Sequence, residues 1–272
     1  MKKKYVSVIA ILVVLTIVVV LVIRYIGNAN SSEPISVTTD SVVFKKGCYA
    51  ADSSCLYISF HFPVVDKDKD GRLSMLLNSD FLQMVGDSLK GTMSGTIKEH
   101  LSSIAMQYDS SFVDYTGAFP SGAVNTWYLK VRYNVLINDG KILCIQYLSD
   151  DYMGGAHGTY RYHYLNLALQ QPRPLSISDV VSDLDVFAER AEEAFRHHFK
   201  IPEGKSLDNF WFPQGKFILP SEYGFSNEGV ILHYNVYEIA PYSDGDIKVV
   251  VPYSSIKDIL NSDWSYLAET KS

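Results

Sequence analysis

The sequence is poor in the residues and motifs that mark several protein classes. With 10 proline and 17 glycine in 272 residues, it has neither a collagen-like nor a low-complexity composition. It lacks the Gly-x-Ser-x-Gly and His-Glu-x-x-His motifs of two large hydrolase classes. Hydrophobic residues make up 47% of the chain and aromatic residues 13%, which excludes a disordered chain. The length therefore predicts one large globular domain or two smaller ones.

Acidic residues are absent from the first 26 positions, which contain four basic residues, Lys2, Lys3, Lys4 and Arg24. The rest of the chain holds all 30 acidic residues and 20 of the 24 basic ones, a formal charge of −10. This charge disfavours nucleic acid and anionic lipid as partners and would attract cationic ones.

Residues 6–26 form a hydrophobic run that only Ser7, Thr16 and Arg24 interrupt. As a helix it would be about 31 Å long, which matches a hydrocarbon core of roughly 30 Å. The lysines before it favour a signal anchor with residues 1–5 in the cytoplasm and 27–41 as a linker. The expected location is the inner membrane of a bacterium, single pass, with the domain in the periplasm or outside. A cleaved signal peptide, which would make the protein secreted, has a shorter apolar core. No cysteine stands directly after the run, which excludes a lipoprotein anchor.

The chain has three cysteines. Cys48 and Cys55 flank a polar turn, and in an oxidising compartment a disulfide between them would close a loop of eight residues. The alternative is two unpaired small residues. Cys144 lies in an apolar segment and is expected to be buried in a strand. The three lack the spacing of a metal site, and neither a metal nor a cofactor is predicted.

Hydrophobic periodicity predicts an α+β fold with a mostly antiparallel sheet and packed helices, preceded by the transmembrane helix. One long helix or two are expected between residues 73 and 106, and a loop over 109–125. A helix is expected over 183–200, and a short closing helix over 252–260. Strands are expected over residues 56–62, 127–137, 141–149, 160–167, 230–236 and 247–251. In strand 127–137, the alternation places Trp127, Val135 and Ile137 on one face.

Asp66, Asp68, Asp70 and Gly71 copy the first half of an EF-hand loop, but Leu77 stands where the loop needs a bidentate glutamate. A charged turn that caps the following helix is the preferred interpretation.

Three segments together carry a family resemblance: residues 152–158, residues 175–181, and residues 237–256 with the run Tyr-Glu-Ile-Ala-Pro-Tyr. They resemble a bacterial family of extracytoplasmic domains, of unknown function as a family. It includes the lysozyme-binding ectodomain of the Bacillus anti-sigma-V factor and the non-catalytic N-terminal region of a peptidoglycan deacetylase. The resemblance implies an N-terminal α+β module over 42–158, a C-terminal one over 159–262 and a tail over 263–272. It does not carry over anti-sigma activity or catalysis, because no corresponding cytoplasmic or catalytic domain is seen in this sequence.

The candidate binding residues fall in two loops. The first loop contains a histidine between glycines, which allow unusual backbone conformations and close approach of another chain. In the second, a tyrosine offers a rigid amphipathic ring, and the resemblance implies that this region contributes to lysozyme recognition. The alternatives are that the histidine fixes a tight loop and that the tyrosine closes over the core. The candidates are Tyr152, Gly154, Gly155, His157, Gly158, Pro241, Tyr242, Ser243 and Gly245.

These observations predict a membrane-anchored binding domain whose partner is a lysozyme-like protein or peptidoglycan. The alternative is a hydrolase acting on cell-wall glycan, in which His157 works with Asp150, Asp151 or a converging His163 and His233. A structural partner of a larger envelope complex is a third hypothesis. No catalytic residue is assigned.

Overall fold

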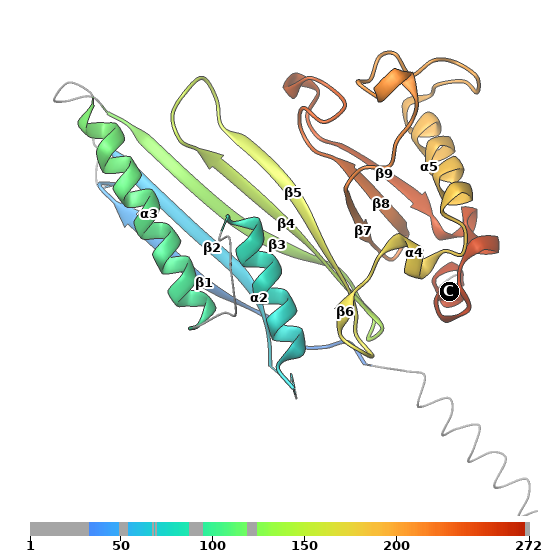
Figure 1. Cartoon of the computed structure of the whole chain (residues 1–272), viewed down its shortest axis with the longest axis horizontal. Helices are drawn as coiled ribbons and strands as arrows, with labels where there is room; N and C mark the ends of the chain where they lie inside the picture. The colour runs from blue at the N-terminus through green and yellow to red at the C-terminus, as the bar shows by residue number, and fades with distance from the viewer. Residues whose placement is uncertain are drawn as a thin grey trace, which may run out of the picture.

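The computed structural model describes residues 33–48, 54–66, 68, 70–86, 95–118 and 124–269 (Figure 1). The expected cytoplasmic tail 1–5 and membrane segment 6–26 lie outside the described residues, as do residues 27–32 of the linker and 270–272 of the tail. In the part of the chain that is described, no helix is long and apolar enough to cross a bilayer.

Six strands form the larger sheet, in the order in which they occur along the chain. They are β1 (Val37–Lys46), β2 (Cys55–Val65), β3 (Thr126–Asn138), β4 (Ile142–Tyr152), β5 (Thr159–Ala168) and β6 (Arg173–Pro174). β2 and β3 are parallel, and the other neighbouring strands are antiparallel. The parallel pair needs a long crossover, which two helices supply. The α+β class is confirmed, with a mixed sheet.

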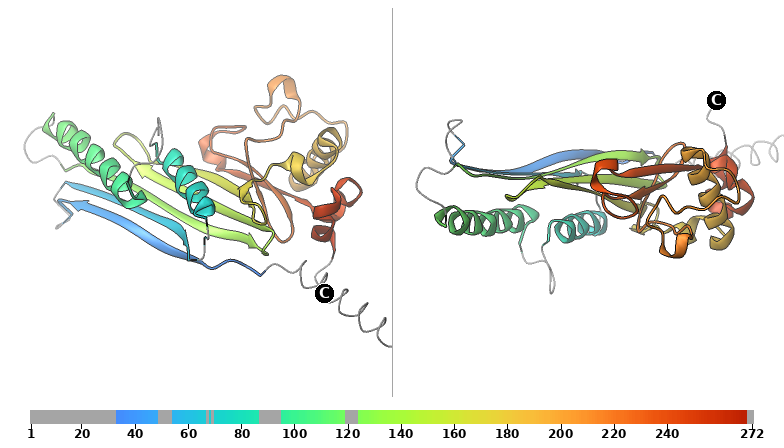
Figure 2. Two further views of the ribbon diagram at one scale, coloured as in Figure 1. Left: turned by 60° about the horizontal axis from the view of Figure 1, so that its bottom comes forward. Right: turned by 90° about the horizontal axis from the view of Figure 1, so that it is seen from above.

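The crossover helices α2 (Arg72–Met84) and α3 (Ile97–Gly117) cover one face of this sheet, called the helix face below (Figure 2). Thr96 and Glu99 form a capping box at the start of α3, so the two-helix alternative is correct. The expected loop over 109–125 is wrong in its first part, because α3 continues to Gly117. Its last turns pack on the sheet, where Phe112 and Tyr115 lie 5.5 and 4.9 Å from the Trp127 ring.

A second sheet contains β7 (Glu222–Phe225), β8 (Gly229–Tyr234) and β9 (Ile247–Pro252), all antiparallel. It packs with α4 (Ile177–Val180) and α5 (Leu184–Phe199), as Figure 1 shows. Every residue of β8 is buried, since both faces of this strand are covered. The expected closing helix is instead two 3-10 turns, Tyr253–Ser255 and Lys257–Ile259. The other 3-10 turns are Pro213–Gly215, Tyr242–Asp244 and Ser262–Ala268.

Side chains of the second sheet and its loops satisfy the free edge of β5. The Asn235 side chain accepts from Tyr162 N at 2.7 Å and donates to Tyr162 O at 3.0 Å. Glu222 Oε2 accepts from Tyr164 N at 3.0 Å. In the other direction, Asn166 of β5 bonds the backbone of β7. The boundary expected between residues 158 and 159 lies in the β4–β5 hairpin, so β5 completes the larger sheet and also carries the second one.

A β-bulge breaks the alternation of β3 between Val135 and Ile137. Val135 is 39% exposed, whereas Ile137 is buried in the core of the second sheet. The prediction that all the odd-numbered residues of this strand share one face is therefore wrong at its end, because the bulge adds one residue and reverses the orientation.

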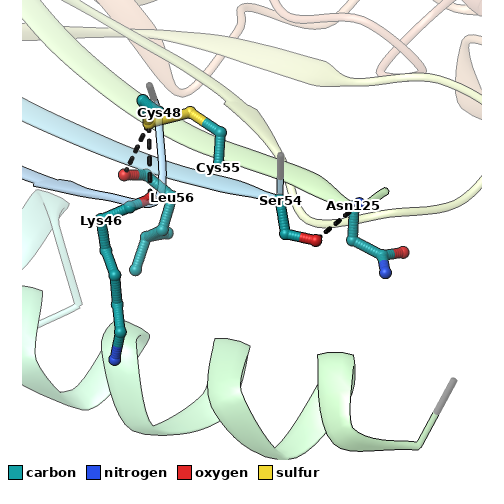
Figure 3. The surroundings of a disulfide bond; sticks show 6 residues. All are labelled: Lys46, Cys48, Ser54, Cys55, Leu56 and Asn125. Carbon is teal, nitrogen blue, oxygen red and sulfur yellow. Dashed lines mark hydrogen bonds between the residues drawn. A yellow bond between two sulfur atoms is a disulfide. The ribbon is translucent and has the colours of Figure 1, made fainter. Parts of the chain in front are cut away.

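The disulfide between Cys48 and Cys55 is present and joins the end of β1 to the start of β2 (Figure 3). Nearby, the Ser54 hydroxyl accepts a hydrogen bond from Asn125 N, just before β3. Cys144 is a buried strand residue as expected, and burial raises the pKa of its thiol to about 12.

The acidic turn before α2 caps that helix, as preferred from the sequence. Asp68 accepts a hydrogen bond from Ser74 N at 2.6 Å, and Asp70 accepts one from Arg72 N at 3.2 Å. Burial opposes the charge on Asp68, but the hydrogen bonds from the first turn of α2 lower the pKa of its carboxyl.

Candidate functional site

The two loops that the sequence singles out meet in the structure. Figure 1 places the β4–β5 loop and the loop between β8 and β9 at the same end of the molecule. The ring of Tyr242 stacks on His157 with centroids 4.5 Å apart. Its hydroxyl donates a hydrogen bond to Gly158 O at 3.1 Å. A contact between residues 84 positions apart thus joins the two segments of the sequence pattern.

Two further tyrosines complete this aromatic group. The Tyr160 and Tyr237 rings lie 6.1 and 5.5 Å from the Tyr242 ring. The Tyr160 hydroxyl donates to Asp246 Oδ1 at 3.1 Å, and burial together with this carboxylate raises the pKa of Tyr160. We call His157, Tyr160, Tyr237 and Tyr242 the two-loop cluster. Sequence reasoning missed Tyr160 and Tyr237 because position alone does not show which tyrosines reach the loops.

Glycine is required at two positions of the first loop. A Cβ on Gly158 would lie 2.7 Å from Asp151 O, so the hairpin closes only without a side chain there. Gly154 has φ +90°, and a Cβ on it would meet the Tyr115 hydroxyl at 2.7 Å. The loop is also tied by Tyr152, whose hydroxyl donates to Gly155 O at 2.9 Å.

The cluster has exposed residues, called its rim below, and a half-buried tyrosine whose position is fixed by a hydrogen bond. Tyr237 is 53% exposed, and His157, Pro241 and Ser243 are also exposed. Tyr242 is half-buried, with its hydroxyl already bonded. Gly245 follows the 3-10 turn at φ +75°, which a glycine adopts readily. The rim residues are free to contact a partner, while the ring of Tyr242 both presents a surface and closes the loop.

Below the cluster, His163 joins three elements on the helix face. Its Nε2 lies 3.1 Å from Asp80 Oδ1 in α2, and its Nδ1 lies 3.1 Å from Glu222 Oε1 in β7. Burial alone would lower the pKa of this histidine, but the two carboxylates outweigh it and raise the pKa to about 10. A histidine that stays protonated is a structural cation and not a general base near neutral pH.

His233 lies on the opposite side of β5 and is fully buried. The Tyr164 hydroxyl is 2.6 Å from its Nδ1, and Asp246 Oδ2 is 2.9 Å from its Nε2. Burial lowers the pKa of His233 although Asp246 acts against it. His163 and His233 do not converge. His163 points to the face of β5 that meets Asp80 of α2, whereas His233 packs against Tyr162 and Tyr164 on the other face.

A groove of about 570 Å³ lies beside the cluster, between the helix face and the 235–237 segment. Asp151, Arg161 and His163 line it together with apolar side chains such as Met84 and Met153. Burial, and secondarily the charge of Asp150, raises the pKa of Asp151. The groove therefore contains both charges and apolar surface next to Tyr237.

The described contacts of His157 are with the backbone and with an aromatic ring. Its Nδ1 lies 2.7 Å from Gly158 O, and no hydrogen bond or ion pair joins it to a carboxylate among the described residues. Nor do those residues include a group of three His, Cys, Asp or Glu side chains placed to hold a metal ion. The two-loop cluster therefore presents aromatic rings, backbone polar groups and the His157 imidazole.

Residues 178–254 match the model of a family described as protein of unknown function (DUF3298). The match extends from α4 to the turn after β9 and so includes the second loop of the cluster, but not the first. No curated protein matches the sequence.

Two solved structures of DUF3298 proteins resemble the whole described fold. A member of the family from Bacteroides fragilis has a TM-score of 0.65 and 24% identity, covering 88% of this chain and 99% of its own. A DUF3298 family protein from Pseudomonas aeruginosa has a TM-score of 0.60 and 19% identity, covering 86% of this chain and 97% of its own. At these identities the likeness establishes the fold alone, and it extends over the larger sheet as well as the residues that match the family model.

Proposed function

We propose that this protein is a membrane-anchored extracytoplasmic binding module, and that the two-loop cluster is its binding surface. The observation that carries the proposal is the stacking of Tyr242 on His157, which brings both predicted loops into one exposed rim. Rigid tyrosines held by hydrogen bonds contribute contact area at low entropic cost, as binding surfaces require.

The location outside the cytoplasm is part of the proposal. The hydrophobic run of residues 6–26 supports an anchor, and the disulfide between Cys48 and Cys55 is typical of an oxidising compartment.

A lysozyme-like protein is the proposed ligand, with peptidoglycan as the second candidate. The resemblance of both loops to the lysozyme-binding ectodomain family supports the first. Animal-type lysozymes are cationic, and a chain with a formal charge of −10 beyond residue 26 would accelerate their association.

Binding of the full chain in detergent to hen lysozyme, measured by biolayer interferometry, tests the proposal. Tyr242→Ala should weaken binding at least tenfold, about the loss expected for a central aromatic contact. Tyr242→Phe should lose less, because the stacked ring remains and only the bond to Gly158 O is removed. Tyr266→Ala is the matched control, since Tyr266 is also half-buried with a bonded hydroxyl but lies in the C-terminal turns.

High salt should reduce the association rate of the wild type. If Tyr242→Ala binds lysozyme as tightly as the wild type does, the two-loop cluster is not the binding surface. If lysozyme does not bind and muropeptides do, peptidoglycan replaces it as the ligand.

The alternative function is a hydrolase that acts on cell-wall glycan through His157 and nearby carboxylates. It would require His157→Ala to abolish glycan turnover without changing the melting temperature. The raised pKa of Asp151 in the adjoining groove favours this alternative, because perturbed carboxyl groups are common in active sites.

A further inference from the structure

The larger sheet has a second face that no described element covers over β1 and β2. Figure 2 (right) shows α2 and α3 on one side of these strands and neither a helix nor a strand on the other. We call this side the open face; it consists of the alternate side chains of β1–β4 that point away from the two helices. Val43, on this face, is 49% exposed.

Tyrosines form a row across the open face. Strand pairing places Lys45 opposite Tyr57, Tyr57 opposite Tyr128, and Tyr128 opposite Tyr152. One basic and three aromatic side chains therefore stand side by side on four adjacent strands, about 4.8 Å apart from strand to strand. All three tyrosines are half-buried, and the Tyr128 and Tyr152 rings are 6.2 Å apart. The row, called the aromatic strip below, runs at right angles to the strands.

Basic side chains lie along this strip. Lys130 Nζ is 4.4 Å from the Tyr128 ring and 5.9 Å from the Tyr57 ring, and Lys45 Nζ is 5.0 Å from the Tyr57 ring. Arg132 is exposed two residues after Lys130 on the same face of β3. Within the described residues, none of these three forms an ion pair.

The local charge of the open face is opposite to that of the chain. The protein carries 30 acidic against 24 basic residues, yet beside Lys45, Lys130 and Arg132 only Asp150 contributes an acid to the described strand positions of this face. Lys45 and Lys130, which are held over tyrosine rings, and the exposed Arg132 can therefore meet an anionic group of another molecule.

We propose that the open face binds an anionic polysaccharide, one whose pyranose rings carry carboxylates. The C–H groups of the sugar rings pack against the parts of the Tyr57 and Tyr128 rings that Lys45 and Lys130 leave uncovered, since aromatic rings are apolar and negatively polarised on their faces. The carboxylates meet Lys45, Lys130 and Arg132 in charge-assisted hydrogen bonds. The row adjoins the two-loop cluster at Tyr152, whose hydroxyl bonds Gly155 O, but the proposed contacts lie on β1–β3 and do not depend on the lysozyme proposal.

Binding of oligogalacturonate to the full chain in detergent, measured by isothermal titration calorimetry, tests the proposal. Lys130→Gln should weaken the affinity about tenfold, the usual effect of losing one charge-assisted contact. Lys141→Gln is the matched control, because Lys141 Nζ lies 4.3 Å from the Tyr266 ring, remote from the open face. Tyr57→Thr keeps a strand-forming residue and should also weaken binding about tenfold. Equal melting temperatures establish that the variants are folded.

Other ligands separate the proposed class from its competitors. The fully methyl-esterified oligomer has the same rings without charge, and inorganic polyphosphate has charge without rings; both should bind at least tenfold more weakly. Equal binding of either one, or no binding of oligogalacturonate, overturns the proposal. So does tighter binding of a single-stranded oligonucleotide or of anionic phospholipid vesicles, or a dimer that Lys130→Gln dissociates. Tyr242→Ala should leave oligosaccharide binding unchanged, so failure of this proposal and failure of the proposed function are distinguishable.

Discussion

The protonated His163 is expected to make the stability of the protein depend on pH above neutrality. This histidine joins Asp80 of α2 to Glu222 of β7, which connects the larger sheet with the second one. Its pKa of about 10 in the folded protein compares with an ordinary value of 6.5. The folded state therefore keeps a proton that the unfolded state releases.

The difference of about 3.5 between these pKa values corresponds to a ceiling of roughly 5 kcal/mol. The three side chains are 26, 22 and 20% exposed, so solvent screening reduces the contribution that we expect to about 2–3 kcal/mol. Because the pKa is raised on folding, this contribution is complete below pH 6.5 and disappears as the pH rises toward 10.

Urea unfolding followed by tryptophan fluorescence, at several pH values between 6 and 10, measures this effect. His163→Gln should lower the free energy of unfolding by about 2–3 kcal/mol near pH 6.5, and the difference from the wild type should shrink as the pH rises. His197→Gln, at an exposed position of α5, serves as the control and should parallel the wild type. If His163→Gln also parallels the wild type over the whole range, then His163 is not held as a cation and the reasoning is wrong.

Two further predictions concern packing and cross-linking. Gly224→Ala should lower the free energy of unfolding by about 1–3 kcal/mol in the same assay, because a Cβ there would clash with the Tyr164 ring. Gly117→Ala is the control and should have little effect, because a Cβ there would meet nothing within 4 Å. Replacing Cys48 and Cys55 together by Ser should cost about 2–3 kcal/mol, and reducing agent should then no longer affect the melting temperature; a variant as stable as the oxidised protein would show that the bond contributes nothing.

Most regular elements could be predicted from the sequence, since apolar periodicity reflects which side of an element is buried. Strands β3, β4 and β5, helix α5 and the buried Cys144 follow this rule. The end of α3 was not predicted, because residues 109–125 are rich in Gly, Ser and Pro. The helix is stabilised there by Phe112 and Tyr115, which pack on Trp127. The 3-10 turns after β9 were not predicted either, because a proline at the start and a short apolar spacing are compatible with both a 3-10 helix and an α-helix.

The candidate site could be predicted only in part. The two loops were identified by their glycines, histidine and tyrosine, and the structure brings them together. Their partners Tyr160, Tyr237 and Asp246 depend on how the second sheet sits against β5, which local patterns do not encode. The open face was missed for the same reason, because its tyrosine row runs across strands that are far apart in the sequence.

The junction of the two sheets determines the geometry of the cluster. A continuous backbone ladder would hold β7 in the plane of the larger sheet, but here the Asn166, Glu222 and Asn235 side chains make the contacts with β5 or its partners instead. Side-chain bridges allow the second sheet to pack on one face of β5 while Glu222 still reaches His163 on the other. The 237–245 segment follows β8 directly, so its approach to the β4–β5 loop depends on these bridges. Weakening the His163 contacts should therefore loosen the two-loop cluster before it disturbs the core beneath α2 and α3.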